Sequence, residues 1–125
     1  MANRISNWTT KISPFRNSPR NHAIDTITIH CVVGQMSVES LCSHFQVANC
    51  SCNWAIGFNG RAAEIVPEGD RSWCSSSPAN DHRAVTIECA SDAFYPYAIN
   101  ANVWKTLIGL CADICQRYNI KKLVW

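Results

Sequence analysis

The sequence has 125 residues, a length typical of one compact domain. Apolar residues make up 47% of it and charged residues 16%, below the roughly 25% of an average globular chain, so we expect a folded domain and not a disordered segment. The formal net charge of +2 is too small to indicate nucleic acid as a partner. Because no apolar run approaches the roughly 20 residues that cross a bilayer, membrane insertion is not predicted either.

The first residues and the cysteines indicate in which cellular compartment the protein is made. The opening MANRISNWTTKISPF lacks the apolar segment of a signal peptide, so we expect synthesis in a reducing cytosol. The eight cysteines then favour small core residues over a disulfide framework, and no paired C-x-x-C motif supports a zinc ribbon. Residues 1–23 carry four basic and no acidic side chains. We interpret them as a solvated leader arm, with contact to an anionic polymer such as a bacterial wall as the alternative.

The expected elements begin with a strand over residues 24–30, where alternation places isoleucines on one face and Thr26, Thr28 and His30 on the other. A helix follows over residues 37–46, because Ser37 is a suitable N-cap and apolar residues recur behind it at helical spacing. Residues 53–58 and 61–66 indicate a β-hairpin. We expect a type I′ turn at its Asn59-Gly60 pair, since that dipeptide accepts positive φ angles.

The second half of the chain is predicted to alternate loop, strand, helix and strand. Residues 67–82 contain two prolines and four serines, so we expect a long loop, the kind of segment on which sites are often built. Residues 83–89 alternate as a strand, residues 100–118 carry one apolar stripe of a helix, and residues 123–125 resemble the start of a strand. These elements predict a single α/β domain with a central mixed β-sheet flanked by α-helices.

Two polar side chains stand at the ends of predicted strands, His30 on the first and Glu88 on the strand over residues 83–89. If these strands are neighbours, an imidazole and a carboxylate share one face, as zinc-dependent hydrolysis requires. Each residue alone also fits a structural role. His30 could be a strand-end histidine bonded to a backbone carbonyl, and Glu88 a rim carboxylate paired with Arg83 or Arg71.

Five blocks in order extend this pattern across the chain. They are Asp25-Thr-Ile-Thr-Ile-His30, Ser51-Cys-Asn-Trp-Ala-Ile-Gly-Phe-Asn-Gly60, Ile65-Val-Pro-Glu68, Arg71-Ser-Trp-Cys-Ser-Ser-Ser77 and Asn80-Asp-His-Arg-Ala-Val-Thr-Ile-Glu88. From about Asp25 onward the sequence resembles the zinc-dependent N-acetylmuramoyl-L-alanine amidases of the type-2 amidase and peptidoglycan-recognition superfamily, especially those of clostridial phages and their hosts. The ordered blocks are far more specific than any one of them.

The resemblance implies an enzyme that cleaves the amide bond between N-acetylmuramic acid and the L-alanine of the stem peptide. It assigns His30 as a zinc ligand and Glu88 as the catalytic acid or base. It also implies a substrate groove bordered by the loop over residues 67–82, and it suggests substrate-binding roles for Asn53, Trp54, Trp73 and His82. The implied partner is peptidoglycan, reached after synthesis in the bacterial cytoplasm and release to the cell wall at lysis, and no protein partner is predicted.

The sequence also departs from the family pattern. A catalytic zinc takes three protein ligands, and the family's other two are a histidine and a cysteine or aspartate beyond the long helix and its following strand. No histidine follows His82 here and no cysteine follows Cys115. We therefore expect residues 1–125 to be an amidase domain lacking its C-terminal portion, with weak zinc binding or none and poor wall lysis. His82 is the most suitable substitute ligand, ahead of His44, with a solvated loop histidine as the alternative.

Two other classes of function stay open at this stage. The first is a non-catalytic peptidoglycan-binding module, since the superfamily's groove can hold muropeptide without zinc. The second is a cysteine amidohydrolase, suggested by eight thiols and four histidines. It would need a thiolate beside a base at a helix N-terminus, and no cysteine here precedes a helix in a recognisable motif.

Overall fold

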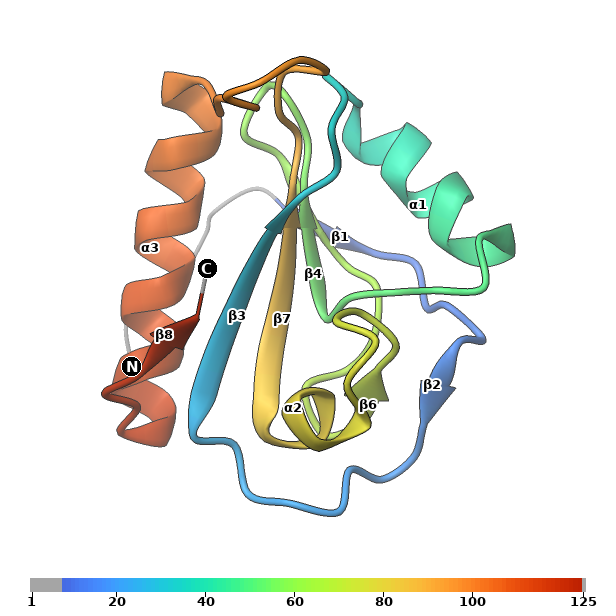
Figure 1. Ribbon diagram of the computed structural model, residues 1–125, viewed down its shortest axis with the longest axis vertical. Coiled ribbons are helices and arrows are strands. Elements are labelled where there is room, and N and C mark those ends of the chain that lie inside the picture. Colours follow the sequence, from blue (N-terminus) through green and yellow to red (C-terminus); the bar gives the residue numbers. More distant parts are fainter. Residues whose placement is uncertain (1–7, 125) are drawn as a thin grey trace.

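The computed structural model describes residues 8–124, and for Leu123 and Val124 it describes the backbone alone. The described range contains three helices, and Figure 1 shows how they lie around a central sheet. The strands are β1 (Trp8–Thr10), β2 (Arg16–Asn17), β3 (Thr26–Cys31), β4 (Trp54–Ile56), β5 (Ala62–Glu64), β6 (Arg71–Ser72), β7 (Ala84–Cys89) and β8 (Leu123–Val124). The helices are α1 (Val38–Val47), α2 (Pro78–Arg83) and α3 (Ala101–Tyr118).

Six of these strands form one mixed sheet in the order β1-β5-β4-β7-β3-β8. Its central strands β3 and β7 are parallel over six residue pairs, and β4 and β8 extend the parallel part on either side. β5 runs antiparallel to β4, and β1 pairs with β5 at the edge. This arrangement confirms the predicted single α/β domain with a central mixed sheet flanked by helices. A separate antiparallel pair joins β2 to β6.

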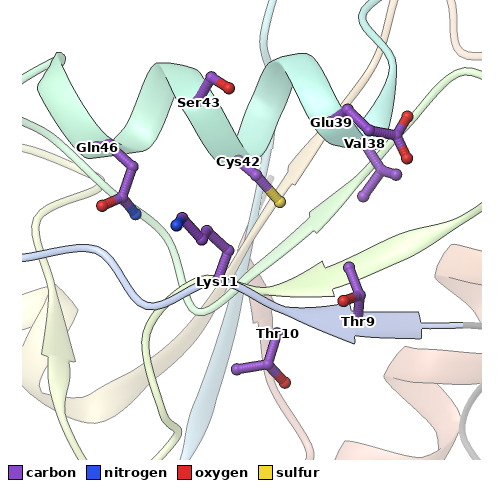
Figure 2. A pocket seen from close by; sticks show the side chains of 8 residues that line it. All are labelled: Thr9, Thr10, Lys11, Val38, Glu39, Cys42, Ser43 and Gln46. Atoms are coloured by element: carbon purple, nitrogen blue, oxygen red, sulfur yellow. The ribbon is translucent and has the colours of Figure 1, made fainter.

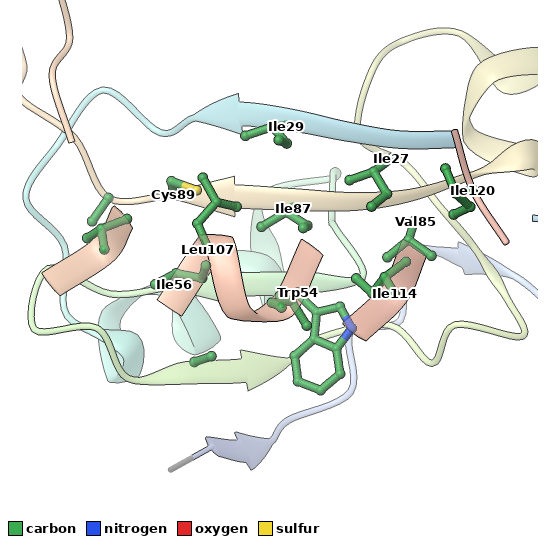
Figure 3. Close-up of a cluster of buried hydrophobic side chains, with 14 residues drawn as sticks. Ile27, Ile29, Trp54, Ile56, Val85, Ile87, Cys89, Leu107, Ile114 and Ile120 are labelled. Carbon is green, nitrogen blue, oxygen red and sulfur yellow. The ribbon is translucent and has the colours of Figure 1, made fainter. Parts of the chain in front are cut away.

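The long helix α3 covers one face of the sheet and builds the larger core on it (Figure 3). Its predicted apolar stripe is confirmed, because Val103, Leu107, Leu110 and Ile114 are all buried. They pack against the odd-numbered residues of β3 and β7, which point to this face. Burying each such side chain stabilises the fold by roughly 1.5–3 kcal/mol. The helix begins behind Asn100, whose side chain accepts a hydrogen bond from Val103 N, and ends at the left-handed Asn119.

The helix α1 covers part of the opposite face. Its residues Val38, Leu41 and Phe45 pack on small side chains of β4 and β5, Ala55 and Ala63. Ser37 caps the helix, as predicted, by accepting a hydrogen bond from Ser40 N. The even-numbered residues of β3 and β7 also point to this face. The apolar cluster under α1 includes none of these residues among the described part of the chain.

A buried ionic network ties α3 to the segment after β5. Glu68 accepts hydrogen bonds from Arg117 Nη1 at 2.7 Å, Tyr118 OH at 2.7 Å and Trp54 Nε1 at 2.8 Å. Arg117 Nε also binds Asp113 Oδ2 at 2.6 Å, one helical turn earlier. Hydrogen bonds and the cation lower the pKa of Glu68 in spite of its burial.

Two local predictions are wrong. The hairpin turn is not type I′, because Gly60 has a φ of +85° but Asn59 is not among the described residues with positive φ. Gly60 N donates to Gly57 O and Gly57 N donates to Arg61 O, so the loop is longer, and the Asn59 side chain accepts from Arg61 N. Residues 67–82 are also more than a loop: they contain β6 and most of α2, which starts at the capping Ser77 followed by Pro78.

The predicted ends of the chain are only partly described. Arg4 of the leader arm and Trp125 of the last predicted strand lie outside the described residues. Residues 8–23 of the arm contain β1, which is exposed at the sheet edge, and β2, which pairs with β6. Among residues 8–124, no helix is both long enough and apolar enough to cross a bilayer.

Candidate functional site

The parallel pairing of β3 with β7 brings His30 and Glu88 side by side. They are register partners near the carboxyl ends of the two strands, on the face opposite α3. The sequence placed both residues on the polar face of their strands, and this placement is confirmed. Because paired residues in neighbouring strands have their Cβ atoms only about 5 Å apart, the imidazole and the carboxylate share one small region of the surface.

A third side chain joins this pair from the segment between β6 and α2. Cys74 Sγ lies 3.7 Å from His30 Nδ1. One donor atom each of His30, Cys74 and Glu88 lies within 4.8 Å of the other two, and these three residues are the one such group of potential metal ligands found in the described part of the chain. A nitrogen, a sulfur and an oxygen donor from three separate elements thus converge.

The position of Cys74 is fixed from both sides. The carboxylate of Asp81, which is fully buried, accepts hydrogen bonds from Cys74 N at 2.9 Å and from Ser75 N at 3.1 Å. On the other side Trp73 donates its N–H to Ser51 Oγ and accepts from Ser51 N. These bonds tie the backbone around Cys74 to Asp81 of α2 and to Ser51, which precedes β4, so the thiol is presented by an ordered segment.

The carboxylate of Glu88 is partly buried, and its Oε1 atom, which is itself buried, lacks a hydrogen-bond or ion-pair partner in the described part of the chain. Neither cation considered from the sequence pairs with it, because Arg83 binds Asp25 and Arg71 binds Asn17. Burial raises the pKa of Glu88 to about 7. A half-buried carboxyl that changes protonation near neutral pH is suited to proton transfer, and an unpartnered oxygen is suited to binding a cation.

The Cys74 thiol is not activated as a nucleophile by its surroundings. Burial raises its pKa well above the ordinary value, and the nearby carboxylates of Glu88 and Asp81 raise it further. The thiolate, which is the nucleophilic form, is therefore scarce at neutral pH. Although Cys74 is close to His30, this electrostatic setting argues against the cysteine amidohydrolase that the sequence left open.

Asn53 and Trp54 are placed beneath the site and not in it. Asn53 is fully buried, donates to Val66 O and Pro67 O, and accepts from Thr86 N, so its polar atoms are used by the fold. Trp54 is 1% exposed and belongs to the core under α3. In this structure both side chains support β7 and the segment after β5, and neither presents a polar atom to a ligand.

Trp73 and His82 lie closer to the surface. Trp73 is half-buried, stacks at a tilt on Phe15 with ring centres 5.7 Å apart, and donates Nε1 to Asn17 Oδ1. His82 sits in the last turn of α2, where its Nδ1 accepts from Asn21 N at 3.0 Å. The group of converging donors contains Cys74 and does not contain His82.

Two hollows are relevant to binding. One of about 380 Å³ adjoins the site and is lined by Ile29, His30, Cys31, Val33, Pro96 and Tyr97. Figure 2 shows the other, of about 540 Å³, between α1 and β1, lined by Thr9, Thr10, Lys11, Val38, Glu39, Cys42, Ser43 and Gln46. Of the three converging side chains, His30 lines the smaller hollow, and none of the three lines the larger one.

Sequence reasoning did not single out Cys74 as a potential metal ligand. The resemblance blocks include it, yet it was grouped with the eight cysteines as a small core residue. The available signal was its position: it is the one cysteine within residues 67–82, the segment expected to border a groove.

The sequence profile of one protein family, described as N-acetylmuramoyl-L-alanine amidase, matches residues 20–124. No curated protein sequence matches the chain.

Solved structures with the same fold include two from Clostridium intestinale URNW. Against the endolysin N-acetylmuramoyl-L-alanine amidase LysCS the TM-score is 0.69 at 21% identity, over 85% of this chain and 70% of the other. Against the N-acetylmuramoyl-L-alanine amidase LysC the TM-score is 0.73 at 19% identity, over 96% and 82%. Drosophila peptidoglycan recognition protein SA gives a TM-score of 0.69 at 16% identity, over 92% and 79%. At these identities the likeness shows a shared fold.

Proposed function

Since the chain belongs to the N-acetylmuramoyl-L-alanine amidase family, as its profile match over residues 20–124 shows, we propose that it hydrolyses the amide bond between N-acetylmuramic acid and the L-alanine of the stem peptide in peptidoglycan. The family membership agrees with the resemblance seen in the sequence blocks. The main structural support for the proposal in this chain is the pairing of His30 with Glu88 on adjacent parallel strands, beside a hollow that His30 lines.

We infer further that the reaction depends on zinc. The donor set supports this inference, because imidazole, thiolate and carboxylate are the ligand types that zinc takes in proteins. The buried, unpartnered Oε1 of Glu88 supports it as well, since a nearby cation would offset the cost of that burial. A zinc ion at His30 would supply a water of lowered pKa and would polarise the scissile carbonyl.

Glu88 is proposed as the residue that carries the proton. Burial raises the pKa of Glu88 to about 7 in the metal-free chain, and a zinc ion nearby would lower that pKa, so the carboxylate is available to take up a proton. As a carboxylate it can take a proton from the attacking water, and as an acid it can give one to the departing L-alanine nitrogen. Because Oε1 has no hydrogen-bond partner among the described residues, these contacts would break no existing hydrogen bond at that atom.

The surroundings of the pair are proposed to hold the substrate. Tyr97 and Val33, which line the hollow beside His30, are proposed to contact the substrate next to the reacting bond. Trp73, which precedes Cys74, and His82, in the last turn of α2, are proposed to border the groove on the side opposite Tyr97 and Val33. We also propose that the protein is of the phage endolysin type, synthesised in the bacterial cytoplasm and active on the wall after release.

The direct test measures the new amino terminus that an amidase creates. Purified peptidoglycan is incubated with the chain, and free L-alanine amino groups are labelled and counted by mass spectrometry. Glu88→Gln is expected to reduce their release by at least about 100-fold, the usual contribution of a general acid–base. Glu39→Gln is the matched control, because Glu39 is an exposed carboxylate on α1 paired with Arg61, and it should release L-alanine termini at the wild-type rate.

Metal dependence is measured in the same assay. A chelator should abolish the release of L-alanine termini, and added Zn²⁺ should restore it. If the chain sediments with purified walls but releases no new termini under any metal condition, the amidase proposal fails and the chain is a peptidoglycan-binding module instead.

A further inference from the structure

We propose that Cys74 is a protein ligand of the metal ion at this site, binding through its thiolate together with His30 Nδ1. This inference rests on the proposed zinc dependence and deepens it, since the family resemblance assigns His30 a metal role but assigns none to Cys74. The ligand pair would then come from β3 and from the segment between β6 and α2, with Glu88 beside it on β7.

The separation of the two donor atoms fits a shared ion. Zinc binds cysteine sulfur at about 2.3 Å and histidine nitrogen at about 2.05 Å, so two such ligands at a tetrahedral angle are about 3.6 Å apart. Cys74 Sγ and His30 Nδ1 are 3.7 Å apart. An ion could therefore bind both atoms with almost no change in their separation.

Glu88 is placed to act next to this ion. Its nearest carboxylate oxygen is within 4.8 Å of both donor atoms. This range includes the position of a carboxylate that hydrogen-bonds to a water on the ion, which agrees with the proton-carrying role proposed above. Two coordination positions would then be open to water and substrate, one more than a zinc ion with three protein ligands leaves open.

The segment that carries Cys74 is organised for ligation before any ion binds. Asp81 bonds the backbone N–H groups of Cys74 and Ser75, and its Oδ1 also accepts from Ser75 Oγ at 2.7 Å. This buried carboxylate is held inside the turn and orients the thiol without contacting it as a ligand. Second-layer bonds of this kind usually tune metal affinity by 10-fold to 100-fold.

Metal binding would also change the protonation state of the Cys74 thiol. The environment of Cys74 raises its pKa, so without a cation the sulfur keeps its proton. When the sulfur–metal bond forms, that proton leaves to solvent, and the thiolate then compensates part of the positive charge of the ion. The balance is one metal ion bound and one proton released at Cys74.

The experiment uses Co²⁺ as a spectroscopic substitute for Zn²⁺. The reduced, metal-free chain is titrated with Co²⁺, and the ultraviolet charge-transfer band of a thiolate–cobalt bond is recorded. We expect one band that saturates at one ion per chain in wild type and is lost in Cys74→Ser. Cys42→Ser is the matched control, because Cys42 is a half-buried cysteine of α1 in the other hollow, and it should keep the band.

A second variant guards against loss of structure. Cys74→Asp replaces the sulfur by an oxygen ligand, so equilibrium dialysis should still find bound Zn²⁺ while the cobalt band is absent. Cys74→Ser should bind Zn²⁺ at least about tenfold more weakly than wild type, with an unchanged circular dichroism spectrum. If wild type shows no thiolate–cobalt band, or if Cys74→Ser retains it, Cys74 is not a ligand.

Failure here and failure of the proposed function are distinguishable. Chelator-sensitive release of L-alanine termini by Cys74→Ser at the wild-type rate would reject the Cys74 ligand and keep the amidase. A thiolate–cobalt band in wild type without any release of termini would keep the metal site and reject the amidase.

Discussion

The cost of burying Glu88 predicts a specific pH dependence of stability. Its pKa rises from the ordinary 4.5 to about 7 in the folded chain because of burial. At about 1.4 kcal/mol for each pKa unit, the ionised form destabilises the metal-free fold by about 3 kcal/mol relative to the neutral form. Glu88→Gln keeps the shape of the side chain and removes the charge, so it should remove this cost.

The sign follows from the two protonation states. Below pH 4.5 Glu88 is protonated in the folded and unfolded chain alike, and wild type and Glu88→Gln should have similar free energies of unfolding. Between pH 4.5 and 7 the unfolded chain ionises first, so wild type loses stability as the pH rises. Above pH 7 the variant should be more stable than wild type by about 3 kcal/mol.

Urea denaturation with reductant and chelator, at intervals from pH 4.5 to 8, measures this difference through tryptophan fluorescence. Groups other than Glu88 titrate in both proteins, so their effects cancel in the comparison. Glu39→Gln should show no difference of this size, because its carboxylate is exposed. A difference between Glu88→Gln and wild type that stays constant with pH, or a variant that is less stable at pH 8, would refute the argument.

Two further predictions concern the framework around the site. Arg117→Ala removes the cation that binds the buried carboxylates of Glu68 and Asp113, and it should lower the free energy of unfolding by about 3–5 kcal/mol in urea denaturation; a loss below 1 kcal/mol would show that the network contributes little. Gly57→Ala would bring a Cβ atom to 2.6 Å from a backbone nitrogen at the start of α1, so we expect a loss of about 1–3 kcal/mol. Gly69→Ala is its control, because nothing lies within 4 Å of the added atom, and equal losses in the two variants would contradict the steric explanation.

The adjacency of His30 and Glu88 was predictable because strand periodicity is a strong local signal. Two alternating segments set their polar side chains on one face, and pairing of the segments then brought the last polar residues together. What the local pattern did not determine was which strands are neighbours. The resemblance of the ordered blocks favoured this pairing only indirectly, because it assigns His30 and Glu88 roles in one reaction.

The proposed role of Cys74 was not predictable in the same way. Its place depends on Asp81, seven residues later, and on Ser51 from another part of the chain. No periodicity connects these residues. The helix α2 was missed for a related reason, since six residues are too few to show a helical repeat. The Ser77-Pro78 pair was a usable signal for its start, because Ser is favoured at the N-cap and Pro at the next position.

The division of β3 and β7 into two faces separates stability from chemistry. Their odd-numbered residues, such as Ile29 and Ile87, pack under α3, whereas His30 and Glu88 project from the opposite face. A slip of one residue in the pairing would reverse both faces, so the apolar core that fixes the register also fixes the positions of the proposed catalytic pair. For the same reason, substitutions of His30 or Glu88 leave the contacts with α3 intact. Loss of activity in such variants can therefore be assigned to the site itself, with the α3 core as the unchanged reference.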